Sequence, residues 1–122
     1  MSKHVVLQIF KDHQKTPKRV DYIFCSDNYL LQINQQFLQH DTYTDIISFP
    51  LETEGTALVG EIYISVDRVK DNAYKLGVPF LEELNRVIFH GALHLCGYTD
   101  HTSKQTAAMR SMENKYLQMR FT

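Results

Sequence analysis

Three of the six histidines in this chain of 122 residues fall within a twelve-residue segment, and their spacing is typical of a metal site. His90 and His94 are four residues apart in a stretch rich in helix-forming residues, so they lie on one helix face, about one turn apart. Gly97 can end that helix, and the chain can then fold back to present His101 to the same point. Three neutral imidazoles suit Zn²⁺, and three protein ligands that leave a fourth position for water are the pattern of a catalytic zinc site.

The residues beside these histidines narrow the chemistry. Gly91 stands where the metalloprotease pattern His-Glu-x-x-His places its general base, so a peptidase interpretation lacks that base. A glycine here has two interpretations. It could allow another backbone segment or the substrate to approach closely, or it could allow tight helix packing. Asp100 is a candidate catalytic residue: it could orient a ligand histidine, bind the metal-bound water or cap the last helix. Zinc held by neutral ligands keeps its double charge and lowers the pKa of its bound water to about 7, which fits phosphodiester hydrolysis.

Composition places the site in one ordinary globular domain spanning residues 1–122. The chain is 43% hydrophobic and carries a net charge of −1, so nothing global indicates a polyanionic partner. Cys25 and Cys96 form no Cys-x-x-Cys pair, which favours a reducing cytoplasmic location. The N-terminus has no signal-peptide pattern, and no run of about 18 apolar residues occurs, so we expect no secretion and no membrane span.

Hydrophobic periodicity and helix caps predict the elements that position the site. Strands are expected at 4–10, 20–25, 45–51 and 57–65, and helices at 26–38, 67–76, 80–96 and 103–119. The basic segment 11–19 reads as a loop, Ser26 and Asp67 as helix caps, and Pro50 indicates an edge or exit position. The predicted fold is therefore α+β: a small four-stranded mixed sheet packed with about four helices, in which the ligand helix lines a cleft.

At this level of detail the residues match a known family. The segment from His90 to His101, His-Gly-Ala-Leu-His-Leu-Cys-Gly-Tyr-Thr-Asp-His, resembles the signature His-Gly-x-Leu-His-Leu-x-Gly-Tyr-Asp-His of the bacterial YbeY family of ribosomal RNA maturation endoribonucleases. Three more landmarks resemble the family in the same order: Ile33-Asn34, Thr44-Asp-Ile-Ile-Ser-Phe-Pro50 and Gly60-Glu-Ile-Tyr-Ile-Ser65.

This resemblance implies a zinc-dependent, single-strand-specific endoribonuclease that acts in 16S ribosomal RNA 3′-end maturation and ribosome quality control. One Zn²⁺ per chain would be held by His90, His94 and His101, and the partners would be single-stranded ribosomal RNA and the small ribosomal subunit with its proteins. Asp45 and Ser48, on the matching strand, would face the cleft or its rim. A strand-start cap is the other interpretation of Asp45.

Three features depart from the family pattern, one of them the segment 11–19 between the first two expected strands, where the family usually has a helix and Pro17 disfavours a full one. Thr99 reads as an extra residue, so His101 follows His94 by seven residues instead of six. Leu38 stands where the family has an arginine, which removes a charge expected near the cleft. Arg86, one turn before the first ligand, could replace that charge or could simply lie in solvent. Tyr98 could stack on a base or could pack at the rim.

Two other classes of function remain possible from the sequence. A zinc peptidase or other metallohydrolase would share the three histidines, and Glu61 could then supply the base that Gly91 does not. A non-catalytic ribosome-binding protein could have kept the histidines for stability alone.

Overall fold

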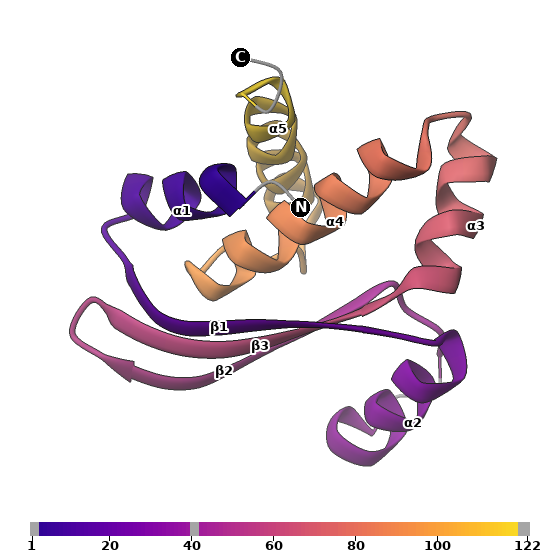
Figure 1. The fold of residues 1–122 in the computed structure, drawn as a ribbon, viewed down its shortest axis with the longest axis horizontal. Coiled ribbons are helices and arrows are strands. Elements are labelled where there is room, and N and C mark those ends of the chain that lie inside the picture. Colours follow the sequence, from indigo (N-terminus) through magenta and orange to yellow (C-terminus); the bar gives the residue numbers. More distant parts are fainter. Residues whose placement is uncertain (1–2, 40–41, 120–122) are drawn as a thin grey trace.

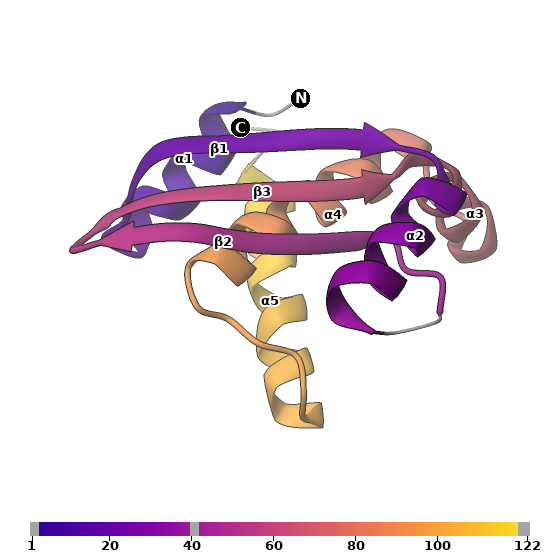
Figure 2. The same cartoon turned by 90° about the horizontal axis from the view of Figure 1, so that it is seen from below.

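The sheet that supports the site has three strands in the order β1–β3–β2. In the computed structural model, which describes residues 3–39 and 42–119, these strands are β1 (Thr16–Cys25), β2 (Ile46–Glu54) and β3 (Ala57–Ser65). β1 runs parallel to β3, and β2 runs antiparallel to it (Figure 2). Pro50 lies on the edge strand β2, where the pairing register shifts between Pro50 and Glu52, so its missing N–H costs little.

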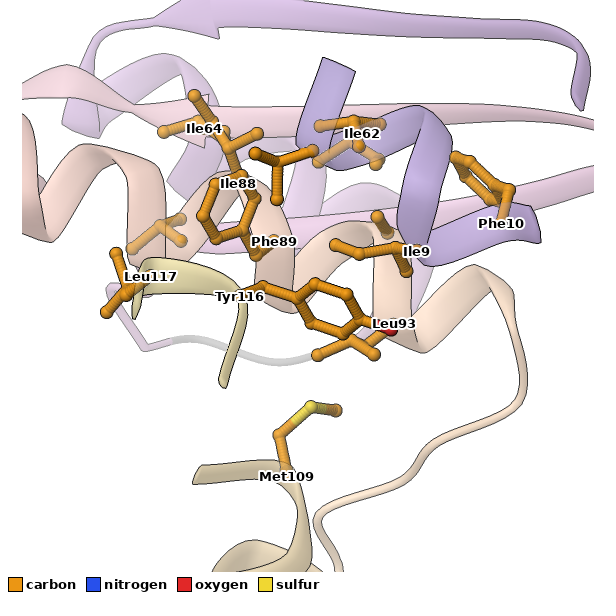
Figure 3. Close-up of a cluster of buried hydrophobic side chains, with 14 of the residues drawn as sticks. Ile9, Phe10, Ile62, Ile64, Ile88, Phe89, Leu93, Met109, Tyr116 and Leu117 are labelled. Atoms are coloured by element: carbon orange, nitrogen blue, oxygen red, sulfur yellow. The ribbon is translucent and has the colours of Figure 1, made fainter. Parts of the chain in front are cut away.

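Helices cover the two faces of the sheet unequally. They are α1 (Lys3–Asp12), α2 (Asp27–Leu38), α3 (Val66–Leu76), α4 (Phe80–Leu95) and α5 (Ser103–Met119). Figure 1 shows α2 alone on one side of the sheet and the other four helices on the opposite side. The larger core lies on the four-helix side, where α4 is sandwiched between the sheet, α1 and α5 (Figure 3). Its fully buried residues include Ile9, Phe10, Ile62, Ile64, Ile88, Phe89, Leu93 and Tyr116.

The predicted α+β class is confirmed, and residues 3–39 and 42–119 form three strands and five helices in place of four and four. The strand expected at 4–10 is wrong, because this segment forms helix α1. Its buried residues, Val5, Val6, Ile9 and Phe10, are two adjacent pairs spaced four apart, which suits one helix face and not an alternating strand. Gln14 then takes a left-handed conformation, with φ of 56°, and β1 begins at Thr16, inside the segment expected to be a loop.

Most of the remaining elements agree with the prediction to within a few residues. Ser26 caps α2 as expected, and its side chain accepts a hydrogen bond from the Tyr29 N–H. The N-cap of α3 is Ser65 and not the expected Asp67. The Ser65 side chain accepts a hydrogen bond from the Arg68 N–H. None of the helices in the described ranges has the length and apolar character needed to cross a membrane.

The C-terminal end of α1 is tied to α5. The Tyr116 hydroxyl donates to Asp12 Oδ2 at 2.7 Å, and the Gln8 amide donates to the other carboxylate oxygen at 2.7 Å. These two hydrogen bonds lower the pKa of Asp12 below its ordinary value. The bond joins residues 104 positions apart, so it fixes the N-terminal helix against the C-terminal one.

We expect Tyr116→Phe to lower the free energy of unfolding by about 1.5 kcal/mol near neutral pH, because a hydrogen bond to a charged acceptor is lost. A carboxylate whose pKa is depressed by folding stabilises the protein above its unfolded pKa and loses that effect as the pH falls through the folded pKa. The difference between wild type and variant should therefore shrink in acid. Urea unfolding from pH 3 to 8 measures it. Tyr74→Phe, at a side chain that is 88% exposed, serves as the control and should change little.

Helix α4 lies close to the sheet at Gly91. A Cβ atom at this position would lie 2.8 Å from Ile62 Cγ2 and 2.9 Å from Ile46 Cδ1, which is closer than side-chain contacts allow. Of the two interpretations of this glycine, the structure bears out helix packing. Gly91 faces the sheet, so residue 91 is no source of a general base for the site.

Gly91→Ala should destabilise the protein by about 1–2 kcal/mol, because overpacking of the helix–sheet contact outweighs the better helix propensity of alanine. Ile46→Val removes one of the clashing atoms, so the double variant should lose less stability than the sum of the two single variants. Chemical denaturation of the four proteins gives this coupling. If the losses of unfolding free energy in the two single variants add up to that of the double variant, the contact of Gly91 with Ile46 is not the reason for the glycine.

Candidate metal centre

Helix α4 presents His90 and His94 side by side on a face that flanks Gly91. Their ring centroids lie 4.5 Å apart, with the ring planes at 82°. The helix ends just after them because Gly97 adopts φ of 106°, a left-handed conformation that glycine allows. The Gly97 N–H then donates to the His94 carbonyl at 3.0 Å, and the Tyr98 N–H donates to Leu93 at 3.1 Å. This Schellman ending turns the chain back over the histidines.

Each histidine is oriented through its Nδ1 atom. His94 Nδ1 lies 2.9 Å from the Tyr98 carbonyl, and His90 Nδ1 lies 2.5 Å from Glu113 Oε2 on α5. Because a carbonyl oxygen only accepts hydrogen bonds, His94 carries its proton on Nδ1, and the Nε2 lone pair is free. Carboxylate and carbonyl partners of this kind orient metal-binding histidines in many proteins.

The Nε2 atoms of both histidines lie near one carboxylate. Asp100 Oδ2 lies 3.7 Å from His90 Nε2 and 3.9 Å from His94 Nε2. One ligand atom from each of these three residues lies within 4.8 Å of the others. Atoms bound to a common cation at about 2.0–2.2 Å can be at most about 4.4 Å apart, so both carboxylate separations suit a shared metal ion.

His101 lies outside this group of three. Its residue is exposed, and its backbone N–H donates to the Gln105 side chain at 3.0 Å. Asp100 follows His94 by six residues, the interval that separates the second and third histidines of the family signature. By this interval, the Asp100 carboxylate stands where the signature has its third histidine.

The hollow on the His90 side is strongly acidic. Its volume is about 210 Å³, and its lining includes Asp45, Glu83, Asp100 and Glu113 against only two guanidinium groups. Burial raises the pKa of Asp45 and of Glu83, although nearby cationic side chains oppose the effect. Asp45 is thus part of the lining of this hollow. A site with an excess of carboxylates is suited to a divalent cation.

The two arginines of this hollow differ in their surroundings. Arg86 has a side chain only 18% exposed, and its Nη1 donates to Glu113 Oε1 at 3.1 Å. The simple solvent-exposed role considered for Arg86 is therefore wrong: it helps to hold the carboxylate that orients His90. Arg110, which the sequence analysis did not single out, is exposed at the same hollow.

A larger hollow, of about 570 Å³, opens on the His94 side. It contains Leu38, Ser48, Tyr98 and His101 among its lining residues, and none of that lining is lysine or arginine. The Ser48 hydroxyl is buried and has no hydrogen-bond partner in the part of the chain that the structure describes. The two hollows meet at Ile46, which lines both.

The protonation of the two histidines follows from their neighbours. Burial and the charge of His90 lower the pKa of His94, so it stays neutral and able to bind a cation. Burial alone would lower the pKa of His90, but the hydrogen bond and charge of Glu113 outweigh this and raise it. The pKa of Glu113 is lowered in turn, because the hydrogen bond from His90 overcomes the effect of burial.

Glu113 was missed by sequence reasoning, although one signal was present. It is a carboxylate on the apolar face of α5, between Met109 and Tyr116, where a charged residue needs a partner. Its partner, His90, is 23 residues away, and no local pattern identifies it.

Glu113→Gln should weaken metal binding by about tenfold, at the lower end of the 10–100-fold typical of such orienting partners. The amide can still accept a hydrogen bond from His90, but it lacks the charge that makes the imidazole a stronger ligand. Titration of metal-free protein with Co²⁺, followed by its visible absorption, measures the affinity. Glu82→Gln, on α4 and outside both hollows, is the matched control. Equal affinities for the two variants would contradict the role assigned to Glu113.

The chain is similar to known proteins over most of its length. The chain is 48% identical to the endoribonuclease YbeY of Flavobacterium psychrophilum over 93% of its own length and 81% of that protein. It is 46% identical to the protein of the same name from Bacteroides fragilis, covering 88% of this chain and 77% of that one. The solution structure of a Thermotoga maritima protein superposes with a TM-score of 0.71 at 32% identity, over 98% and 79% of the two chains. A sequence model described as Endoribonuclease YbeY matches residues 2–120, and the chain therefore belongs to the YbeY family.

Proposed function

We propose that the protein is a zinc-dependent endoribonuclease that hydrolyses phosphodiester bonds in single-stranded RNA. The observation that carries the proposal is the group of His90, His94 and Asp100, with both imidazoles oriented through Nδ1, in a chain of the YbeY family. We further propose that its RNA is ribosomal, that it acts in 16S 3′-end maturation and ribosome quality control in the cytoplasm, and that it works with the small ribosomal subunit. The resemblance of the sequence motifs supports this cellular role.

In this proposal each residue of the group has a defined task. His90 and His94 offer Nε2 atoms to one Zn²⁺, and Asp100 offers a carboxylate oxygen. When bound, the cation supplies Lewis-acid polarisation of a phosphoryl oxygen and makes water a stronger nucleophile. Glu113 and the Tyr98 carbonyl keep the two imidazoles in the tautomer that leaves Nε2 free.

The two hollows suggest how a single RNA strand lies across the group. Arg110, exposed at the acidic hollow, is our candidate for a phosphate contact, because Arg86 is already engaged with Glu113. The larger hollow has no cationic lysine or arginine in its lining, so we assign it to bases and ribose. Tyr98 and Ser48 line that hollow and remain proposed substrate contacts. An unpaired strand can turn its bases into such a hollow, whereas a duplex cannot.

A peptidase has less support. Gly91 faces the sheet, and Glu61, which might have supplied a base, lies next to Gly60 in β3. A Cβ on Gly60 would meet Leu95 of α4, so the alternating Glu61 side chain points to the opposite face of the sheet. There it accepts a hydrogen bond from Tyr63 at 3.3 Å.

Cleavage of a labelled single-stranded RNA, with a duplex of the same sequence as control, tests the function. We expect His90→Ala and Asp100→Ala to lower zinc content and to reduce cleavage by about 100-fold or more, because each removes one of three ligands. His101→Ala should retain zinc and most activity. If instead His101→Ala loses zinc and activity while Asp100→Ala retains both, His101 is the third ligand. A wild-type protein that binds zinc but leaves RNA intact while it cuts a peptide would exclude the nuclease.

A further inference from the structure

We propose that His13, at the end of α1, is a positioning residue for the metal centre and acts on it through Tyr98. The inference rests on the proposed metal site and extends it to the N-terminal helix. His13 is 77 positions from His90 along the chain, and no motif of the sequence connects the two.

The His13 ring is held at both nitrogen atoms. Nδ1 lies 2.7 Å from the Ile9 carbonyl, one turn back in α1, and Nε2 lies 3.2 Å from the Tyr98 hydroxyl. Since the carbonyl can only accept, Nδ1 carries the proton, and the Tyr98 hydroxyl donates to Nε2. The two rings also meet edge to face, with centroids 5.2 Å apart and planes at 85°.

Tyr98 passes this restraint to the ligands. Its N–H is bonded to Leu93, its hydroxyl to His13, and its carbonyl accepts from His94 Nδ1 at 2.9 Å. With the backbone fixed at one side and the ring at the other, the carbonyl keeps its direction toward His94. Asp100 follows two residues later, so the same anchor also sets the start of the segment that delivers the carboxylate.

A similar hydrogen bond in the same protein, between Asp12 and Tyr116, makes no connection to a metal-site histidine and can serve as a control. Asp12, the neighbour of His13, holds the hydroxyl of Tyr116 at 2.7 Å. Both bonds join the end of α1 to a tyrosine hydroxyl in the C-terminal part of the chain. Only Tyr98 also bonds a metal-site histidine, so loss of the Tyr116 hydroxyl should affect stability without affecting His94.

The first test uses metal-free protein. Nuclear magnetic resonance follows exchange of the His94 Nδ1 proton with solvent in wild type, His13→Ala, Tyr98→Phe and Tyr116→Phe. We expect this proton to be protected in wild type and Tyr116→Phe and to exchange about tenfold faster in the other two variants. A proton that is unprotected in wild type, or equally protected in all four proteins, would overturn the inference.

The second test measures Co²⁺ affinity for the same proteins and for the double variant His13→Ala/Tyr98→Phe. Each single variant should bind about tenfold more weakly, as expected when an orienting contact of a ligand histidine is loosened. The double variant should lose no more than either single variant, because both changes break one chain of contacts. Additive losses, or a loss of the same size in Tyr116→Phe, would reduce His13 to a general stabilising role.

RNA cleavage separates this inference from the proposed function. A wild-type protein without nuclease activity, in which both His13→Ala and Tyr98→Phe still release the His94 proton, would remove the function and keep the positioning role. If the wild type cleaves RNA but the exchange of the His94 proton is the same in all variants, the proposed function stands and the positioning role of His13 is excluded.

Discussion

The contact between Gly91 of α4 and the isoleucines of the sheet is the constraint on which the site depends. With no side chain at this position, the helix backbone comes within van der Waals reach of Ile62 and Ile46. At about 100° per residue, His90 and His94 lie roughly 60–100° around the helix from Gly91, so the seating of Gly91 on the sheet sets the direction of this neighbouring face. The apolar packing of Ile88, Phe89 and Leu93 in the core therefore fixes where the imidazoles lie before any polar contact is made.

Helix α5 turns this helix face into a site by bringing a carboxylate into a nearly closed position. The Glu113 side chain is only 6% exposed, and an isolated charge there would be strongly unfavourable. Arg86 and His90 bond its two oxygens separately, so both oxygens of the buried carboxylate have a partner. The arrangement has a directional consequence: bonding at Nδ1 leaves Nε2 of His90 facing Asp100. The contacts that stabilise the buried charge of Glu113 are thus the same ones that orient His90 as a ligand.

Sequence reasoning found the features that are local along the chain and missed those that are not. The histidine pair, the strands around Ile47 and Ile62 and the edge position of Pro50 follow from spacing and residue type within a few positions. The segment 4–10 is helical and not the expected strand, because Val5, Val6 and Ile9, whose β-branched side chains favour a strand, also share one helix face. The contacts of Glu113 with His90 and of His13 with Tyr98 depend on tertiary packing over 23 and 85 positions, beyond the reach of any periodicity.

The carboxylate in the group alters the electrostatics that three histidines would imply. Three neutral imidazoles would leave a divalent cation with its full double charge, whereas Asp100 in place of His101 would neutralise one of the two charges. Attraction for a phosphate would fall accordingly, and Leu38 offers no positive charge on the side of the larger hollow. Arg110, at the acidic hollow beside Asp100, is placed to restore one of them. The carboxylate ligand lowers the positive charge at the cation, and Arg110 adds positive charge beside it. Together they keep the net electrostatic potential of the site attractive to a polyanion.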